Sequence, residues 1–205
     1  MSQPESASRP ATAGTTAEVV GTRMLELRVH GRGGQGAQVG CQILAGAFFR
    51  AGRWVQAFAA YGGERRGAPV TAAVRVDGAP IHLRCDVEHA DVAVVLDATL
   101  LGLIDPASLA PDALVVVNAP AAPCGRLPGV TRIVAIDAAA IARRHRLGPI
   151  VATAMIGAFA AASRLLTLEE LLPAIEEWSP VKKAENTAAC TEAYAEMTAL
   201  EGRAP

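Results

Sequence analysis

The chain has 205 residues, enough for one domain with a helical extension, and its hydrophobic content of 51% excludes an intrinsically disordered protein. Its formal net charge of -1 gives no electrostatic case for nucleic-acid binding. The longest apolar stretch, residues 150–162, is too short to cross a bilayer, so we expect no membrane span.

Residues 1–23 are expected to form a disordered tail, because they are rich in small and polar residues and lack the apolar core of a signal peptide. One domain is expected over residues 24–205, with an α/β core at 24–148 and helices at 149–199. No cysteine belongs to a C-x-x-C pair, so we predict neither a zinc nor an iron–sulfur site in this chain. Scattered thiols without a signal peptide indicate a cytoplasmic protein.

The N-terminal part alternates strands with one helix, according to the spacing of its apolar residues. The expected elements are a strand at 25–29, a helix at 38–51 and a strand at 54–59. A β-hairpin is then predicted from 70–76 and 80–85, because the Asp77-Gly78 dipeptide between them favours a type I′ turn. Such a hairpin would add antiparallel strands to the sheet.

Near-continuous apolar runs follow, as is typical of buried parallel strands. They predict strands at 91–97, 114–118 and 132–137 and helices at 138–146, 150–166, 168–178 and 181–197. Thr167 and Glu170 have the spacing of a capping box at a helix start. We therefore predict an α/β fold: a Rossmann-like three-layer sandwich with a mixed, mostly parallel sheet that contains a β-hairpin, followed by a helical C-terminal segment.

A glycine-rich loop between the first strand and the first helix is the leading candidate site. It matches G-x-G-x-x-G and consists of Gly31, Arg32, Gly33, Gly34, Gln35 and Gly36. Glycines let the backbone approach a ligand, and a helix N-terminus attracts anions, so this loop is expected to bind the anionic part of a phosphate-bearing ligand. The alternative is a tight turn that needs glycine only for packing.

An ordinary dinucleotide site would need an acidic residue after the second strand to hold a ribose. Residues 55–61 contain none, which weakens but does not remove the hypothesis of an independent NAD(P)-binding enzyme. A second loop, residues 61–67, combines three glycines with Glu64, Arg65 and Arg66. It predicts either an arginine clamp oriented by a carboxylate or a flexible charged turn.

The two loops, in this order and at this spacing, resemble the gamma subunit or gamma domain of the 2-oxoacid:ferredoxin/acceptor oxidoreductases. The resemblance covers about residues 24–197. A strand ending at Asp97 and a helical C-terminal segment are also similar to that family. The residues of that segment that carry the similarity are Lys182, Lys183, Asn186 and Tyr194.

The resemblance implies a gamma subunit of an enzyme that oxidatively decarboxylates a 2-oxoacid to an acyl-CoA, inactive when isolated. It implies that Gly31, Arg32, Gly33, Gly34, Gln35 and Gly36 contact coenzyme A at a subunit boundary. Tyr61, Glu64 and Arg66 would then lie near the active site.

The resemblance also implies partners. Thiamine diphosphate, magnesium and 4Fe–4S clusters would be carried by alpha, beta and delta-type subunits. Ferredoxin would accept the electrons, or NAD through a further flavoprotein subunit. The identity of the 2-oxoacid is left open, and a scaffold subunit whose glycine loops serve only packing remains the third hypothesis.

Overall fold

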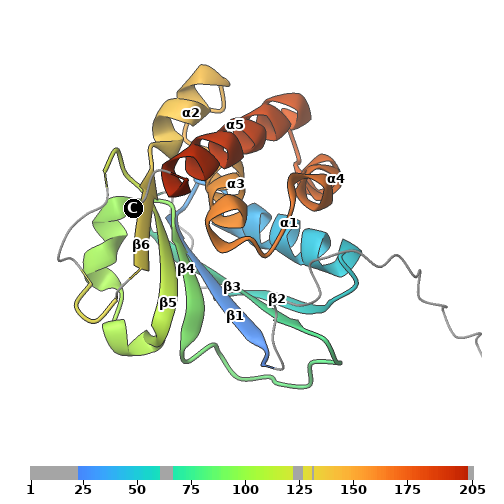
Figure 1. Ribbon diagram of the computed structural model, residues 1–205, viewed down its shortest axis with the longest axis vertical. Coiled ribbons are helices and arrows are strands. Elements are labelled where there is room, and N and C mark those ends of the chain that lie inside the picture. The colour runs from blue at the N-terminus through green and yellow to red at the C-terminus, as the bar shows by residue number, and fades with distance from the viewer. Residues whose placement is uncertain (1–22, 61–66, 122–126, 131, 203–205) are drawn as a thin grey trace, which may run out of the picture.

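In the computed structural model the described residues are 23–60, 67–121, 127–130 and 132–202. Of the tail expected over residues 1–23, residues 1–22 lie outside them. The described strands form one six-stranded sheet in the order β2-β3-β1-β4-β5-β6 (Figure 1). The strands are β1 (Leu25–Arg32), β2 (Trp54–Ala60), β3 (Pro69–Asp77), β4 (Ala90–Val95), β5 (Leu109–Asn118) and β6 (Arg132–Ile136).

The sheet is mixed, as predicted. β1, β4, β5 and β6 run parallel to their neighbours in this series, whereas β3 is antiparallel to both β1 and β2. The predicted hairpin at Asp77-Gly78 is wrong, because residues 80–85 form no strand. The reason is that β1 and β2 already pair with both edges of β3, which leaves no edge for a strand after Asp77.

The described residues contain five α-helices in the predicted order, and Figure 1 shows α1, α3, α4 and α5 over one face of the sheet. They are α1 (Ala37–Arg50), α2 (Ala138–Arg144), α3 (Ala152–Ser163), α4 (Leu168–Trp178) and α5 (Lys183–Glu201). The opposite face is covered by the short 3-10 helices η2 (Ala98–Leu103) and η3 (Pro106–Ser108) and by irregular segments. The third layer of the sandwich is therefore thin.

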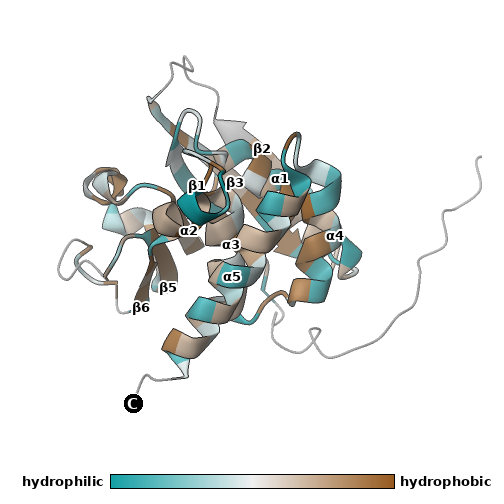
Figure 2. Cartoon of the chain, turned by 90° about the horizontal axis from the view of Figure 1, so that it is seen from above, coloured by the Kyte–Doolittle hydropathy of each residue, from teal (hydrophilic) through white to brown (hydrophobic). Residues whose placement is uncertain are grey.

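The helix α3 is the centre of the helical layer. Residues 152–162 are all buried, and Thr153 is the one polar side chain among them. It packs between α1 and α5, which lie on either side of it in Figure 2. At Gly157 the backbones of α3 and α5 come so close that a Cβ atom would lie 2.2 Å from the carbonyl oxygen of Cys190.

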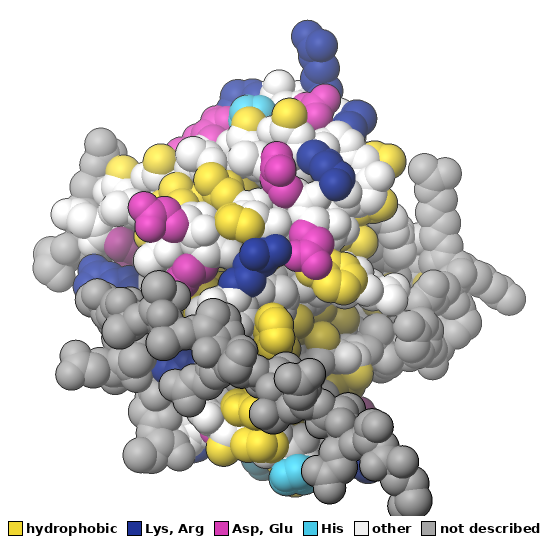
Figure 3. Space-filling model, turned by 90° about the vertical axis from the view of Figure 1, so that its right-hand side faces the viewer, with side chains coloured by type: hydrophobic (Ala, Val, Ile, Leu, Met, Phe, Trp, Pro, Cys, Tyr) yellow, Lys and Arg dark blue, Asp and Glu magenta, His cyan; other side chains and the backbone are white. Residues whose placement is uncertain are grey.

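Helix α4 begins with the predicted capping box, in which Thr167 and Glu170 each bond the other's backbone. The face on the right-hand side of Figure 1 carries hydrophobic side chains dispersed among acidic and basic ones (Figure 3). Within the described parts of the chain, no helix combines the length and apolarity that a bilayer crossing requires.

Candidate functional site

The glycine loop lies where β1 ends and α1 begins, as the sequence predicts. Gly34 has a φ of 98° and Gly36 a φ of 90°, a left-handed conformation that other residues rarely adopt. A Cβ atom on Gly36 would also lie 3.2 Å from Cβ of Ala152 at the start of α3. Glycine is therefore required at position 36 both for the turn and for close packing.

The second loop ends directly against the first. The Gly33 amide donates to the Ala68 carbonyl at 3.0 Å, and the Gly67 amide donates to the Gly33 carbonyl at 3.3 Å. Gly67 is the last residue of the second loop, residues 61–67. Three of its predicted site residues lie outside the described residues: Tyr61, Glu64 and Arg66.

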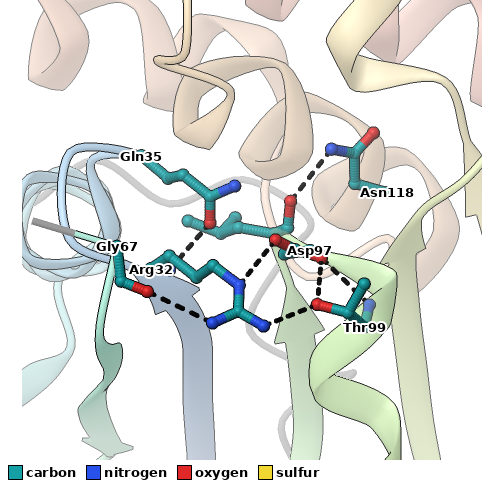
Figure 4. A network of polar contacts seen from close by, with 7 residues as sticks. Arg32, Gln35, Gly67, Asp97, Thr99 and Asn118 are labelled. Atoms are coloured by element: carbon teal, nitrogen blue, oxygen red, sulfur yellow. Dashed lines mark hydrogen bonds and ion pairs between the residues drawn. The ribbon is translucent and has the colours of Figure 1, made fainter.

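Arg32 joins the two loops to the end of β4, as Figure 4 shows. Its Nε donates to Oδ2 of Asp97 at 2.9 Å, and its Nη2 donates to Oγ1 of Thr99 at 2.8 Å. Its Nη1 donates to the Gly67 carbonyl at 3.2 Å. Every nitrogen of the guanidinium thus has a partner within the chain, which makes Arg32 a clamp between loops.

Burial alone would raise the pKa of Asp97, but hydrogen bonds from Thr99 and Arg32 outweigh it and lower the pKa. Asp97 also caps η2, because its Oδ1 accepts the Thr99 amide at 2.9 Å. The carboxylate is therefore ionised at neutral pH and holds both Arg32 and the start of η2.

Gln35 closes the glycine loop through both its side chain and its backbone. Its Oε1 accepts the Arg32 amide at 2.7 Å, and its carbonyl accepts the Val151 amide at 3.3 Å. The second bond ties the loop to the residue that precedes α3. The loop is held from three sides, by β3, by the end of β4 and by α3.

A pocket of about 590 Å³ opens beside the loop. Its wall combines the loop with the first turns of α1 and α3 and with the connection between α4 and α5. The lining residues are Arg32, Gly33, Gly34, Gly36, Ala37, Gln38, Val39, Val70, Ile150, Ala152, Thr153, Ser179, Pro180, Val181 and Asn186. The pocket is mostly apolar with a few polar groups, which is typical of a small-molecule site.

Three of the described helices, α1, α3 and α5, begin at this pocket without a side-chain cap, and α1 and α3 adjoin the glycine loop. The first bond inside α1 runs from the Gly40 amide to the Gly36 carbonyl, and that inside α3 from the Met155 amide to the Val151 carbonyl. Among the described residues, no side chain caps either start, whereas α2 and α4 are capped by Asp137 and Thr167. The amides of both first turns have no partner within their helices and give the pocket a positive potential.

Three buried polar residues support the pocket from the C-terminal helices. Oγ1 of Thr153 donates to Oδ1 of Asn186 at 2.9 Å, and Nδ2 of Asn186 donates to the Val181 and Lys182 carbonyls. Ser179 is 3% exposed, and its Oγ has no hydrogen-bond partner in the described structure. The sequence does not reveal the place of Ser179-Pro180 in the pocket, because nothing local indicates that this connection folds back onto the glycine loop.

A second cavity, of about 450 Å³, lies on the opposite face of the sheet and is lined in part by Arg28, His30, Phe58 and Thr71. Burial, followed by the charge of Arg28, lowers the pKa of His30 to about 4. The Nε2 atom of His30 is buried and has no partner in the part of the chain that the structure describes. His30 is therefore neutral at physiological pH.

This burial predicts an acid sensitivity. Unfolded His30 takes up a proton near pH 6.5 but the folded form resists it down to about pH 4, so stability is lost as pH falls through that window. Between pH 7 and pH 5 the unfolding free energy should fall by about 2 kcal/mol more in the natural protein than in His30→Gln. Urea titrations at both pH values measure this difference, and parallel losses in the two proteins would contradict it.

A family model and individual known proteins assign this chain to the same family. The family model described as pyruvate ferredoxin/flavodoxin oxidoreductase matches residues 26–196. The chain is 42% identical to the pyruvate synthase subunit PorC of Methanothermobacter thermautotrophicus, over 86% of this chain and 98% of that protein. It is 40% identical to the pyruvate/ketoisovalerate oxidoreductases common subunit gamma of Thermococcus kodakarensis, over 87% of this chain and all of that one.

Solved structures agree with this result. The crystal structure of pyruvate oxidoreductase subunit PORC from Thermotoga maritima has a TM-score of 0.71 and 34% identity, covering 84% of this chain and 96% of that one. The fold also recurs in a 2-oxoglutarate:ferredoxin oxidoreductase from Magnetococcus marinus solved with 2-oxoglutarate, coenzyme A and succinyl-CoA. That likeness has a TM-score of 0.66 and 21% identity, and covers 89% of this chain and 32% of the longer one.

Proposed function

We propose, from the premise that this chain belongs to the pyruvate ferredoxin/flavodoxin oxidoreductase family as a gamma subunit, that its glycine-loop pocket binds coenzyme A at a subunit boundary. The observation that carries the proposal is the pocket itself. It joins the glycine loop to two uncapped helix starts and an apolar wall. The glycine loop and the helix starts suit the phosphates of coenzyme A, and the apolar wall suits its pantetheine arm.

The relative from Thermococcus kodakarensis is a gamma subunit common to pyruvate and ketoisovalerate oxidoreductases. A subunit common to two such enzymes serves the parts of the reaction that do not depend on the 2-oxoacid. For the present chain this favours a role toward coenzyme A, with the acid pocket on other subunits. Pyruvate is the substrate that we propose for the assembled enzyme, since it appears in the names of the relatives compared above.

Other subunits are the partners of this chain, and we assign to alpha, beta and delta-type subunits the thiamine diphosphate, the magnesium and the 4Fe–4S clusters. No group of three or more His, Cys, Asp or Glu in the described residues could hold a metal ion. Cys41 and Cys190 are buried, and burial raises the pKa of each thiol to about 12, which disfavours the thiolate that a cluster needs. Cys41 and Cys190 therefore do not suit an iron–sulfur cluster.

The electrons released by the reaction go to ferredoxin in our proposal, and NAD would be reached only through a further flavoprotein subunit. The isolated chain is expected to be inactive, since it would lack the cofactor that attacks the 2-oxoacid. We place the complex in the cytoplasm, where the free thiols of Cys41, Cys85 and Cys190 stay reduced.

Changing Gly34 tests the ligand. Nothing lies within 4 Å of a Cβ atom built on Gly34, so a side chain there would reach open space beside the pocket. In the assembled enzyme, Gly34→Asp should raise the KM for coenzyme A about tenfold or more, because its carboxylate would repel the phosphates. Steady-state kinetics with coenzyme A as the varied substrate measure this change.

Gly34→Asn is the matched control, since it has the same shape and the same cost of a positive φ but no charge. Its KM for coenzyme A should stay within about threefold of the natural value. Equal coenzyme A kinetics in Gly34→Asp and the natural enzyme would remove the ligand assignment. They would favour a loop that serves packing alone.

A further inference from the structure

We infer that the second cavity, on the face of the sheet opposite the glycine-loop pocket, binds a small monocarboxylate with an apolar body, whose carboxylate group accepts hydrogen bonds from Arg28 and His30. The inference goes beyond the proposed function, because it involves neither coenzyme A nor the glycine loop. The cavity has a volume of about 450 Å³, which is within the range of small-molecule sites. Two polar side chains of its wall indicate the charged end of the ligand, and the remaining wall indicates its body.

Arg28 and His30 lie side by side in this wall. Both belong to β1, two residues apart, so their side chains project from the same face of the sheet. β1 pairs with β3 in a register that places His30 opposite Thr71, which also lines the cavity. A guanidinium, an imidazole and a hydroxyl are therefore brought together at one wall of the cavity.

The imidazole of His30 has an unused hydrogen-bonding atom. Its Nε2 is buried and has no partner among the described residues. On the other side of the ring, Oγ1 of Thr71 lies 3.5 Å from Nδ1. The ring is neutral at physiological pH, and a Thr71 hydroxyl that donates to Nδ1 leaves the hydrogen on Nε2. A buried donor without an acceptor costs stability, so a ligand oxygen at Nε2 is favoured.

Arg28 supplies the positive charge. Its side chain is partly buried, its Nη2 donates to the Val87 carbonyl, and no carboxylate pairs with it in the described parts of the chain. Arg75, which projects from the same face of the sheet, is by contrast bonded to Glu26 at 2.7 Å. A partly buried guanidinium favours an anionic partner, and a carboxylate presents two oxygens, one for Arg28 and one for His30.

The rest of the wall limits the ligand to one charged group. Phe58, Leu100 and Ile104 give the cavity an apolar side that suits a hydrocarbon body. Two acidic residues, Asp86 and Asp105, also line the cavity, and both are exposed. Water screens their repulsion of a carboxylate held at Arg28, but they disfavour a ligand that carries a second negative charge toward the solvent. The cavity should therefore select monocarboxylates over dicarboxylates.

The test uses the full chain and three six-carbon probes in NMR titrations. Hexanoate should bind with a Kd of about 1 mM or lower. Adipate adds a second carboxylate, and hexanamide keeps the body but has no charge, so each should bind at least about tenfold more weakly. Equal binding of hexanoate and hexanamide, or no binding of hexanoate up to about 20 mM, would overturn the inference.

The histidines report where the probe binds. Hexanoate should shift the ring resonances of His30 but not those of His82 and His89, which are exposed and do not line the cavity. Shifts of equal size at all three histidines would show that hexanoate binds elsewhere on the surface, and the inference would fail.

Arg28→Met removes the cationic partner but keeps a long side chain. The Kd of hexanoate should rise about tenfold or more, the effect of losing a hydrogen bond to a charged group. Arg84→Met is the matched control, since Arg84 is exposed and does not line the cavity, and it should leave the Kd unchanged. Natural hexanoate affinity in Arg28→Met would contradict the inference. If Arg28→Met failed to fold, the three probes with the natural protein would still decide it.

Discussion

Gly157→Ala is expected to destabilise the protein by about 3 kcal/mol, the largest loss of stability that we predict for a single methyl group. The added Cβ would lie 2.2 Å from the Cys190 carbonyl oxygen and 3.1 Å from its Cα. Backbone atoms cannot rotate away as a flexible side chain can. Helices α3 and α5 would have to separate, and this would loosen the contact that holds Thr153 against Asn186.

Thermal unfolding measures this effect, and a loss of about 9 °C in the melting temperature is expected for a chain of this size. Gly102→Ala is the matched control, because a Cβ atom at Gly102 meets nothing within 4 Å. That variant should stay within about 0.5 kcal/mol of the natural protein. Equal melting temperatures for the two variants would show that α3 and α5 do not pack as closely as described.

Arg32→Met is expected to reduce kcat/KM for coenzyme A about tenfold or more in the assembled enzyme, while the fold is retained. The substitution keeps a long side chain but removes the bonds to Gly67, Asp97 and Thr99. Gly67 ends the second loop, so the loss of this bond would weaken the contact between that loop and the glycine loop. Small displacements of positioning groups have large kinetic effects.

Arg50→Met controls for the loss of an ion pair in general. Arg50 bonds Glu177 at 2.7 Å, but both side chains are about half exposed, so this pair should contribute little. Asp97→Asn should reproduce part of the Arg32→Met defect, and the double variant should be no worse than Arg32→Met alone, because the two residues act as one unit. Natural kcat/KM values in Arg32→Met would refute the role of this clamp.

Periodicity in the sequence predicted most of the fold because apolar runs report burial directly. The strands before and after the glycine loop, and the helix from Leu168 to Trp178, occur where they were expected. The hairpin at Asp77-Gly78 failed because turn chemistry is local, whereas strand pairing depends on which edges are free. Both edges of β3 are taken, and Asp77 instead accepts the Ala79 amide at 3.2 Å outside the sheet.

The candidate site was predictable only in part. The glycine pattern between a strand and a helix located one wall of the pocket, since its meaning depends on neighbouring residues alone. The other wall comes from Ile150, Thr153 and Ser179, more than 110 residues later in the chain. Their approach results from the packing of α3 on the sheet and of α5 on α3, which no local pattern reports. The clamp formed by Arg32 and Asp97 likewise needed the parallel pairing of β1 with β4.

Hydrogen exchange of the assembled enzyme with and without coenzyme A shows whether this pocket binds coenzyme A. Coenzyme A is expected to slow exchange in residues 33–39 and 152–154, which contain the loop and the uncapped starts of α1 and α3. The first turn of α4, closed by its own capping box, should exchange equally in both states. Unchanged exchange in the loop and in the start of α3, with coenzyme A at saturation, would contradict the binding of coenzyme A at this pocket.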